Sequence, residues 1–163
     1  MITDKPNTEH GNGTNTVLTA GAGKQINFEQ RTTPENINSL SEGQIFVFGS
    51  NLSGRHGKGA AKTALGWGAK WGQAKGLQGR TYGIPTKNST ITRTLSVNEI
   101  EPYVFEFIEF AKANKQMTFL VTEIGCGLAG LKPKDIAPLF KEAVNVLNVH
   151  LPSSFWHKLS TCR

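Results

Sequence analysis

The sequence has few cysteines and no long apolar run, and both shortages restrict the class of protein. Only Cys126 and Cys162 occur among 163 residues, without a C-x-x-C pair or the cysteine–histidine spacing of a metal site. Two isolated cysteines argue against a disulfide framework and a zinc site, and they favour a reducing compartment. We find no signal peptide and no segment long enough to cross a bilayer. We therefore expect a cytoplasmic protein that contacts no membrane and carries no metal or cofactor.

Acidic side chains are also in the minority. Twelve aspartates and glutamates face eighteen lysines and arginines, which leaves a formal net charge of +6. The basic residues form no continuous run, so this charge fits a soluble basic protein as well as one with a polyanionic partner. The length fits one domain, and there are no internal repeats. We expect a monomer, with nucleic acid as the polyanion to consider.

The first part of the chain differs in composition from the rest. Residues 1–30 are mostly polar, and we expect them to form a flexible segment before a single domain over residues 31–163. Thr33 followed by Pro34 predicts a short helix start, with the threonine as N-cap.

The most informative stretch is a glycine-rich one near the start of the domain. Residues 45–48 are apolar and predict a buried strand, and glycines at 49, 54, 57 and 59 follow. A helix is expected from about Lys58 to Trp71. Glycines let a backbone approach a ligand closely, and amides at a helix start bind phosphate. The pattern is neither a P-loop nor a G-x-G-x-x-G fingerprint, so the loop alone is weak evidence.

Similar units follow along the chain. Residues 81–84 predict a second strand with Pro85–Asn88 leaving its end, and 118–123 a third strand with a glycine-rich loop over 124–130. Apolar residues from Ile100 to Ala111 recur at helical spacing, and Ser96 with Glu99 offers a capping box. A further helix is expected from Pro133 and a strand at 149–151, with Phe155 and Trp156 anchoring the C-terminal tail. This alternation predicts an α/β fold, a three-layer α/β/α arrangement whose sheet has helices on both faces.

Ligands of such sheets bind beyond the carboxyl ends of the strands, where the three loops are expected to meet. At these loops the sequence resembles macrodomains, most closely the branch of DNA-ADP-ribosylation antitoxins and terminal ADP-ribose glycohydrolases. The matching residues are Asn51 with the G-x-G-x-A helix start at 57–61, the Pro-Thr-Lys turn at 85–87, and Ile-Gly-Cys-Gly-Leu at 124–128. The match covers roughly residues 43–148. The resemblance extends the expected fold to a macrodomain-like mixed sheet.

The resemblance implies a site for ADP-ribose or an ADP-ribosylated substrate. Lys87 would attack the anomeric carbon of the ribose, and Asn51 would orient that ribose. The remaining ligand-binding residues that it implies are Ser50, Gly57, Lys58, Gly59, Ala60, Thr86, Gly125, Cys126, Gly127, Leu128, Ala129 and Gly130. The implied activity is hydrolysis of the linkage between ADP-ribose and an acceptor, either nucleic acid or protein.

Two departures keep other functions open. Some members carry an acid directly after the Gly-Cys-Gly-Leu run, where this chain has Ala129, and no adenine-binding aspartate can be assigned. Lys87 is equally explained as a solvated or phosphate-pairing turn lysine. The alternatives are therefore a non-catalytic module that binds ADP-ribose or an NAD derivative as a sensor, and a basic nucleic-acid accessory protein with structural glycines.

Four other residues carry competing interpretations. His56 is better explained as a surface loop residue than as a phosphate contact, and Cys126 as a small packing residue than as a reactive thiol. Trp67 and Trp71 are four residues apart, and helical core packing explains them better than base stacking.

Overall fold

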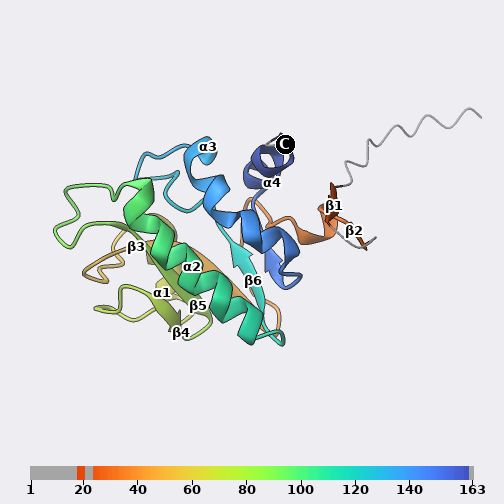
Figure 1. The fold of residues 1–163 in the computed structure, drawn as a ribbon. Helices are drawn as coiled ribbons and strands as arrows, with labels where there is room; N and C mark the ends of the chain where they lie inside the picture. Colours follow the sequence, from red (N-terminus) through yellow and green to blue (C-terminus); the bar gives the residue numbers. More distant parts are fainter. Residues whose placement is uncertain (1–17, 21–23, 162–163) are drawn as a thin grey trace, which may run out of the picture.

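The computed structural model describes residues 18–20 and 24–161, and its centre is a five-stranded sheet (Figure 1). The strand order is β4-β5-β3-β6-β7. The four strands β3 (Gln44–Asn51), β5 (Thr81–Lys87), β6 (Thr118–Val121) and β7 (Val149–His150) are parallel, and β4 (Gly76–Gln78) pairs antiparallel with β5 at one edge. The sheet is therefore mixed, as expected, with a central strand that begins the glycine-rich unit.

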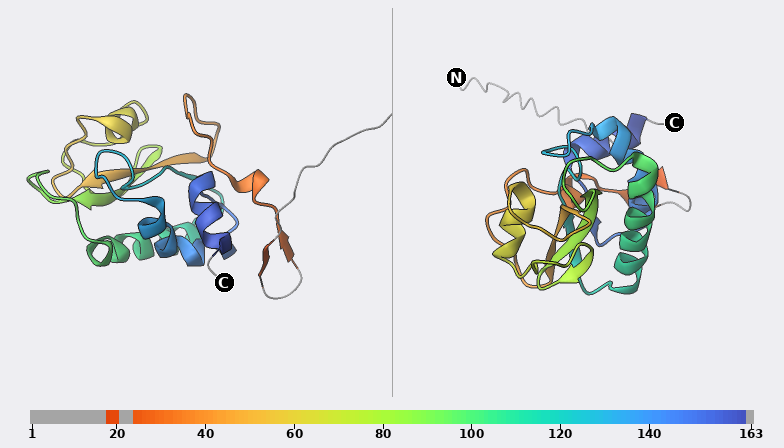
Figure 2. Two further views of the ribbon diagram at one scale, coloured as in Figure 1. Left: turned by 90° about the horizontal axis from the view of Figure 1, so that it is seen from above. Right: turned by 90° about the vertical axis from the view of Figure 1, so that its left-hand side faces the viewer.

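Helices cover both faces of this sheet, which confirms the predicted three-layer α/β class. Side chains of β3 alternate: Phe46 and Phe48 pack toward α1 (Gly59–Leu65), whereas Ile45 and Val47 belong to the larger core on the other face. That core includes α2 (Val97–Ala113), α3 (Pro133–Ile136), the 3-10 helix η2 (Ala137–Asn145) and α4 (Ser153–Thr161). Figure 2 shows α1 and α2 on opposite sides of the sheet.

Helix α2 follows its local sequence signals closely. The Glu99 amide donates to Ser96 Oγ at 3.2 Å and the Ser96 amide to Glu99 Oε2 at 2.8 Å, so the predicted capping box is present. Hydrogen bonds from Arg93 and from the Ser96 amide lower the pKa of Glu99 to about 2. The helix continues through Pro102, and its apolar stripe lies buried in the core.

Three local expectations were wrong. Thr33 starts no helix, because its amide donates to the Leu151 carbonyl at 2.9 Å and holds the segment in an extended conformation. Helix α1 ends at Leu65, where glycines follow and Gly68 takes a φ of +98°. Residues 85–87 lie within β5 because their backbone continues to pair with β3. Phe155 and Trp156 are buried and anchor the C-terminal residues to the core as expected, within a helix, α4, that the sequence patterns had not indicated.

Arg31 links the N-terminal residues of the domain to its C-terminal part through hydrogen bonds. It ends the 3-10 helix η1 (Glu29–Arg31), and its buried guanidinium donates to the carbonyls of Ala143, Val144, Val146 and Val149 at 2.8–3.1 Å. Trp156 Nε1 donates in turn to the Arg31 carbonyl at 2.9 Å. Burial lowers the pKa of Arg31 to about 10.

Most of the segment expected to be flexible, residues 1–17 and 21–23, lies outside the described residues. In the described part of residues 1–30, the strands β1 (Leu18–Ala20) and β2 (Lys24–Ile26) pair antiparallel in a sheet of their own. None of the helices over residues 18–20 and 24–161 is long and apolar enough to cross a membrane.

Candidate functional site

The three loops expected to meet do so at the carboxyl ends of the parallel strands. They line one cleft of about 780 Å³, here called the main cleft. Its walls come from residues 49–51 at the end of β3, from residues 55 and 57–61 after that strand, and from residues 122–125 and 127–129 after β6. Thr86 and Lys87 at the end of β5, with Ile91 and Trp71 in neighbouring loops, complete the lining. Asn51, Lys87 and Gly127 therefore share a single cavity, which is the arrangement that a ligand contacting all three loops requires.

Lys87 is half-buried at the last position of β5. Its carbonyl accepts a hydrogen bond from the Leu52 amide at 3.0 Å, which keeps the end of β5 beside the end of β3. The pairing register shifts by one residue here, so that Asn51 lies opposite Lys87 and not Thr86. No carboxylate pairs with Lys87 among the described residues. Its position is therefore set by the strand backbone and not by an ion pair.

The Asn51 side chain is mostly engaged within its own loop. Its Oδ1 accepts from the Arg55 amide at 3.0 Å and from Ser53 Oγ at 2.8 Å, and its Nδ2 donates to the Arg55 carbonyl at 2.6 Å. A primary amide has two N–H donors, so one remains after the Arg55 carbonyl is bonded. Asn51 thus shapes the loop and has little hydrogen-bonding capacity left for a ligand.

Two more predicted residues turn their hydroxyl groups toward the protein. Ser50 Oγ donates to the Ala74 carbonyl, and Thr86 Oγ1 donates to the Ser50 carbonyl at 3.2 Å. Both residues line the main cleft but use these donors to hold its floor together. Of the other predicted residues, those that line it are Gly57, Lys58, Gly59, Ala60, Gly125, Gly127, Leu128 and Ala129.

The loop over 125–130 is held against both neighbouring walls. A Cβ on Gly59 would lie 3.4 Å from Leu128 Cδ1, which is ordinary contact between the two loops, and the positive φ of +58° is what favours glycine at this position. On the other side, Thr94 Oγ1 donates to the Ala129 carbonyl at 2.6 Å. Gly130 closes the turn by donating to the Gly127 carbonyl at 3.0 Å, and it lines neither cleft described here.

A neighbouring cleft of about 720 Å³ adjoins the main cleft and has no counterpart among the sequence predictions. The segment 33–38 forms one wall, and the residues that line both cavities are Ala60, Thr122, Glu123 and Gly127. Thr33 is buried, and its Oγ1 has no hydrogen-bond partner in the described structure. The only signal in the sequence was the polar composition of the segment, which local patterns cannot place beside a distant loop.

Cys126 lines the neighbouring cleft and not the main one. Its thiol contacts the Ile124 carbonyl at 3.6 Å. Burial, with Glu123 and Asp135 nearby, raises the pKa of Cys126 to about 11. A thiol with such a pKa stays protonated near neutral pH, which supports packing over nucleophilic reactivity.

Glu123 is an acidic residue that lines both clefts. It follows β6 and is exposed, and its Oε1 accepts a hydrogen bond from Ser154 Oγ at 2.5 Å. It is the only acidic residue among those that line the main cleft. Glu123 therefore lies at the boundary of the two clefts, with its carboxylate bonded to Ser154.

The expected positions of His56 at the surface and Trp71 in the core were wrong, whereas Trp67 packs in the core as expected. His56 is completely buried, because its Nε2 lies 3.0 Å from the Lys70 carbonyl and 3.2 Å from the Gln73 carbonyl. Trp71 is 64% exposed at the rim of the main cleft and is not a core residue, since α1 ends before it. Trp67 packs against Phe46 as expected, at 4.9 Å between ring centroids.

Within residues 18–20 and 24–161, no cluster of histidine, cysteine and carboxylate side chains could hold a metal ion. The chain matches no protein-family model, no curated protein and no solved structure, so its function must be argued from the two clefts themselves.

Proposed function

We propose that the protein binds ADP-ribose in a macrodomain-like manner and hydrolyses the bond between ADP-ribose and an acceptor. The observation that supports this proposal most is the convergence of Asn51, Lys87 and Gly127 on one cleft. The resemblance in sequence rests on three separate loops, and a shared ligand needs all three within reach. If the three loops lay on different sides of the molecule, no single ligand could contact them and the proposal would have no support.

The volumes of the two clefts, and the wall that they share, suit an elongated ligand with one half in each cleft. Cavities of 300–1,000 Å³ are typical of small-molecule sites, and both clefts fall in that range. We propose that the ribose to be released lies by Lys87 in the main cleft. The diphosphate would pass the shared wall at Gly127, and the adenine would occupy the neighbouring cleft, which is lined by Thr33 and the residues that follow it.

Lys87 is the proposed nucleophile. Its neutral amine would form a bond to the anomeric carbon while the bond from that carbon to the acceptor breaks, and the acceptor leaves with the electron pair and takes up a proton. Water would then release ADP-ribose and restore the amine. Because Ala129 supplies no acid, we propose that Glu123 transfers the proton, held in place by Ser154.

The test separates binding from turnover. We expect Lys87→Ala to retain calorimetric affinity for ADP-ribose within a few-fold and to lose release of ADP-ribose from modified oligonucleotides or proteins. Lys115→Ala is a matched control, since Lys115 is exposed and precedes β6 at the opposite end of the sheet. Unchanged turnover in Lys87→Ala would contradict the assignment, and absence of ADP-ribose binding in the unmodified protein would contradict the whole proposal.

A non-catalytic binding module is the second candidate, and two observations favour it. Ala129 replaces the expected acid, and the Asn51 amide is largely used within its loop. This function predicts tight binding of ADP-ribose or an NAD derivative with no release from any modified substrate. Glu123→Gln distinguishes the two candidates further, because it should slow turnover in an enzyme and leave a pure binder unaffected.

A further inference from the structure

Ile91 has a backbone conformation that isoleucine rarely adopts. Its φ is +63°, and no other residue in the described part of the chain has a positive φ unless it is a glycine. In this region the Cβ of an L residue approaches its own backbone closely, and a β-branched side chain is especially disfavoured. Glycine or asparagine would adopt the conformation at a lower cost. Ile91 is therefore strained, and the strain needs a reason.

Hydrogen bonds within the loop hold Ile91 in this conformation. The loop covers residues 88–96 and connects β5 to α2 (Figure 1). Asn88 Oδ1 accepts from the amides of Thr92 and Arg93 at 3.0 and 3.1 Å. The Asn88 amide donates to the Arg93 carbonyl at 2.9 Å, and the Ile91 amide donates to the Asn88 carbonyl at 3.1 Å. The backbone is thus fixed on both sides of Ile91.

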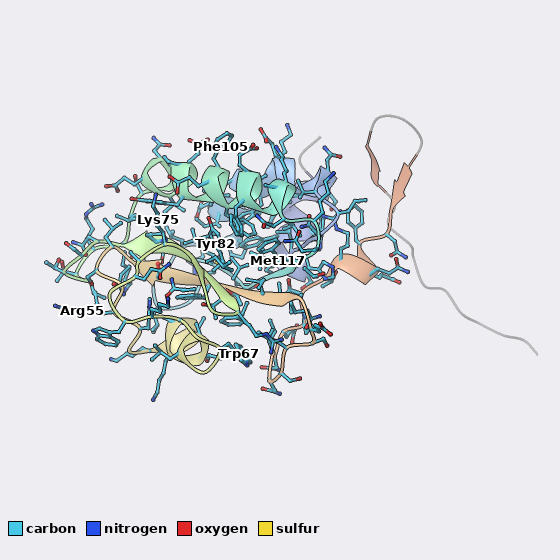
Figure 3. The ribbon with its side chains drawn as sticks, turned by 90° about the horizontal axis from the view of Figure 1, so that it is seen from below. Arg55, Trp67, Lys75, Tyr82, Phe105 and Met117 are labelled. Carbon is cyan, nitrogen blue, oxygen red and sulfur yellow. The ribbon has the colours of Figure 1, made fainter. Side chains whose placement is uncertain are left out.

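The same loop is attached to two walls of the main cleft. Lys87, at the end of β5, pairs with Thr94 in an antiparallel bridge. Thr94 Oγ1 donates in turn to the Ala129 carbonyl at 2.6 Å. Ile91 and Lys87 both line the main cleft, and Figure 3 shows Arg55, another lining residue, at this end of the sheet. The strained residue therefore belongs to the wall of the proposed site.

Packing in the core does not explain an isoleucine at this position. Ile91 is half-buried, but it belongs to neither hydrophobic cluster of the described structure and is not among the apolar residues packed against them. Strained residues persist mainly where a ligand site or a switch requires them. The cleft wall is thus the feature that accounts for this side chain.

We propose that Ile91 is a specificity-determining residue, which contacts the part of the ligand that lies beside Lys87. The inference rests on the proposed function, in which that part is the terminal ribose of ADP-ribose. A ribose carries C–H groups as well as hydroxyls, and an aliphatic side chain against the C–H groups removes apolar surface from water. ADP lacks this ribose. Ile91 should therefore favour ADP-ribose over ADP, since specificity is a difference between two affinities.

Calorimetry with ADP-ribose and with ADP tests the contact. We expect Ile91→Asn and Ile91→Gly to lower the ratio of the two affinities about tenfold, through weaker binding of ADP-ribose and not of ADP. Ile91→Val keeps a branched apolar side chain and should change the ratio by less than about threefold. Ser89→Gly is the matched control, because Ser89 is an exposed residue of the same loop that does not line the main cleft, and it should leave the ratio unchanged.

The melting temperature tests the strain separately. Asparagine and glycine tolerate a positive φ, so Ile91→Asn and Ile91→Gly should raise it by about 2–4 °C while they lose specificity. A lower melting temperature in both would make Ile91 a packing residue and overturn the proposal. An unchanged ratio of affinities in both would overturn it as well and leave the proposed function standing. If the natural chain bound neither nucleotide, the proposed function would fail, and this assignment with it.

Discussion

The amide side chain of Asn51 is bonded to both backbone groups of Arg55. Its Oδ1 accepts from the Arg55 amide and its Nδ2 donates to the Arg55 carbonyl. One side chain therefore satisfies two polar groups of the loop that borders the main cleft, and the loop keeps its shape without other secondary structure. The asparagine that suggested a ligand contact in the sequence is, in the structure, first a loop-forming residue.

Asn51→Ala should accordingly lower stability as well as affinity. Removing the amide leaves two backbone groups of Arg55 without partners in a partly buried loop, and we expect a loss of about 1–3 kcal/mol in the free energy of unfolding. Urea denaturation measures it. Asn51→Asp keeps the acceptor and loses the donor, so its free energy of unfolding should lie between those of the natural chain and of Asn51→Ala. A variant as stable as the natural chain that loses only affinity would instead make Asn51 a ligand contact alone.

Gly57→Ala and Gly127→Ala test ligand approach without disturbing the free protein. Neither position has a positive φ, and an added Cβ at either meets nothing within 4 Å. We expect stability to change by less than about 1 kcal/mol. If a diphosphate lies against both loops, each methyl group should obstruct it and weaken ADP-ribose binding about tenfold by calorimetry, a cost of about 1.4 kcal/mol. Unchanged affinity in both variants would remove the diphosphate from this wall.

Gly59→Ala should behave differently from these two. Its φ of +58° costs an alanine roughly 1–2 kcal/mol, and its methyl group would point at Leu128. We therefore expect a lower melting temperature together with lower affinity. Stability equal to that of Gly57→Ala would show that the loop relaxes to another conformation.

Arg31→Met should be among the most destabilising substitutions in the chain. It would remove the donors of four carbonyls, of Ala143, Val144, Val146 and Val149, and some of these groups would remain buried. We expect a loss of about 3–5 kcal/mol in the free energy of unfolding. Arg31→Lys keeps the charge but presents a single nitrogen, so it should recover only part of this. A loss below about 1 kcal/mol would mean that water reaches these carbonyls.

The protein should lose stability in alkali through Tyr82. Burial, with Glu106 nearby, raises the pKa of Tyr82 to about 12 from an ordinary value near 10. Because the folded state favours the protonated phenol, its contribution is complete below pH 10 and is lost as the pH rises through 12. Tyr82→Phe should reduce the dependence of unfolding free energy on pH above 10.

Cys126 changes stability in the same direction, since its pKa is raised to about 11. A Cys126→Ala background removes this contribution, and the effect of Tyr82 is then the difference between this background with and without Tyr82→Phe in urea titrations at several pH values. Identical pH profiles with tyrosine and phenylalanine at position 82 would contradict the assignment.

Some features could be predicted because they depend on a few neighbouring residues. The Ser96 and Glu99 box starts α2 through contacts three residues apart, and the stripe from Ile100 to Ala111 buries one face. Strand β3 is similarly evident from its continuous apolar run. The alternation of such units, with the preference of parallel strands for helical crossovers, was enough to predict the layered α/β class.

Other features depend on partners far away in the chain, and no local pattern reports them. His56 is buried where its Nε2 bonds to the carbonyls of Lys70 and Gln73, and Trp71 is exposed because α1 ends before it, at Leu65. The segment that begins at Thr33 forms a cavity wall because the Thr33 amide bonds to the distant Leu151 carbonyl. Sequence alone thus determined the central strand β3, the helix α2 and the glycine loops that follow the strands, since short-range sterics and periodicity control these features. Only the tertiary structure decided which side chains face the clefts, because that depends on packing between distant segments.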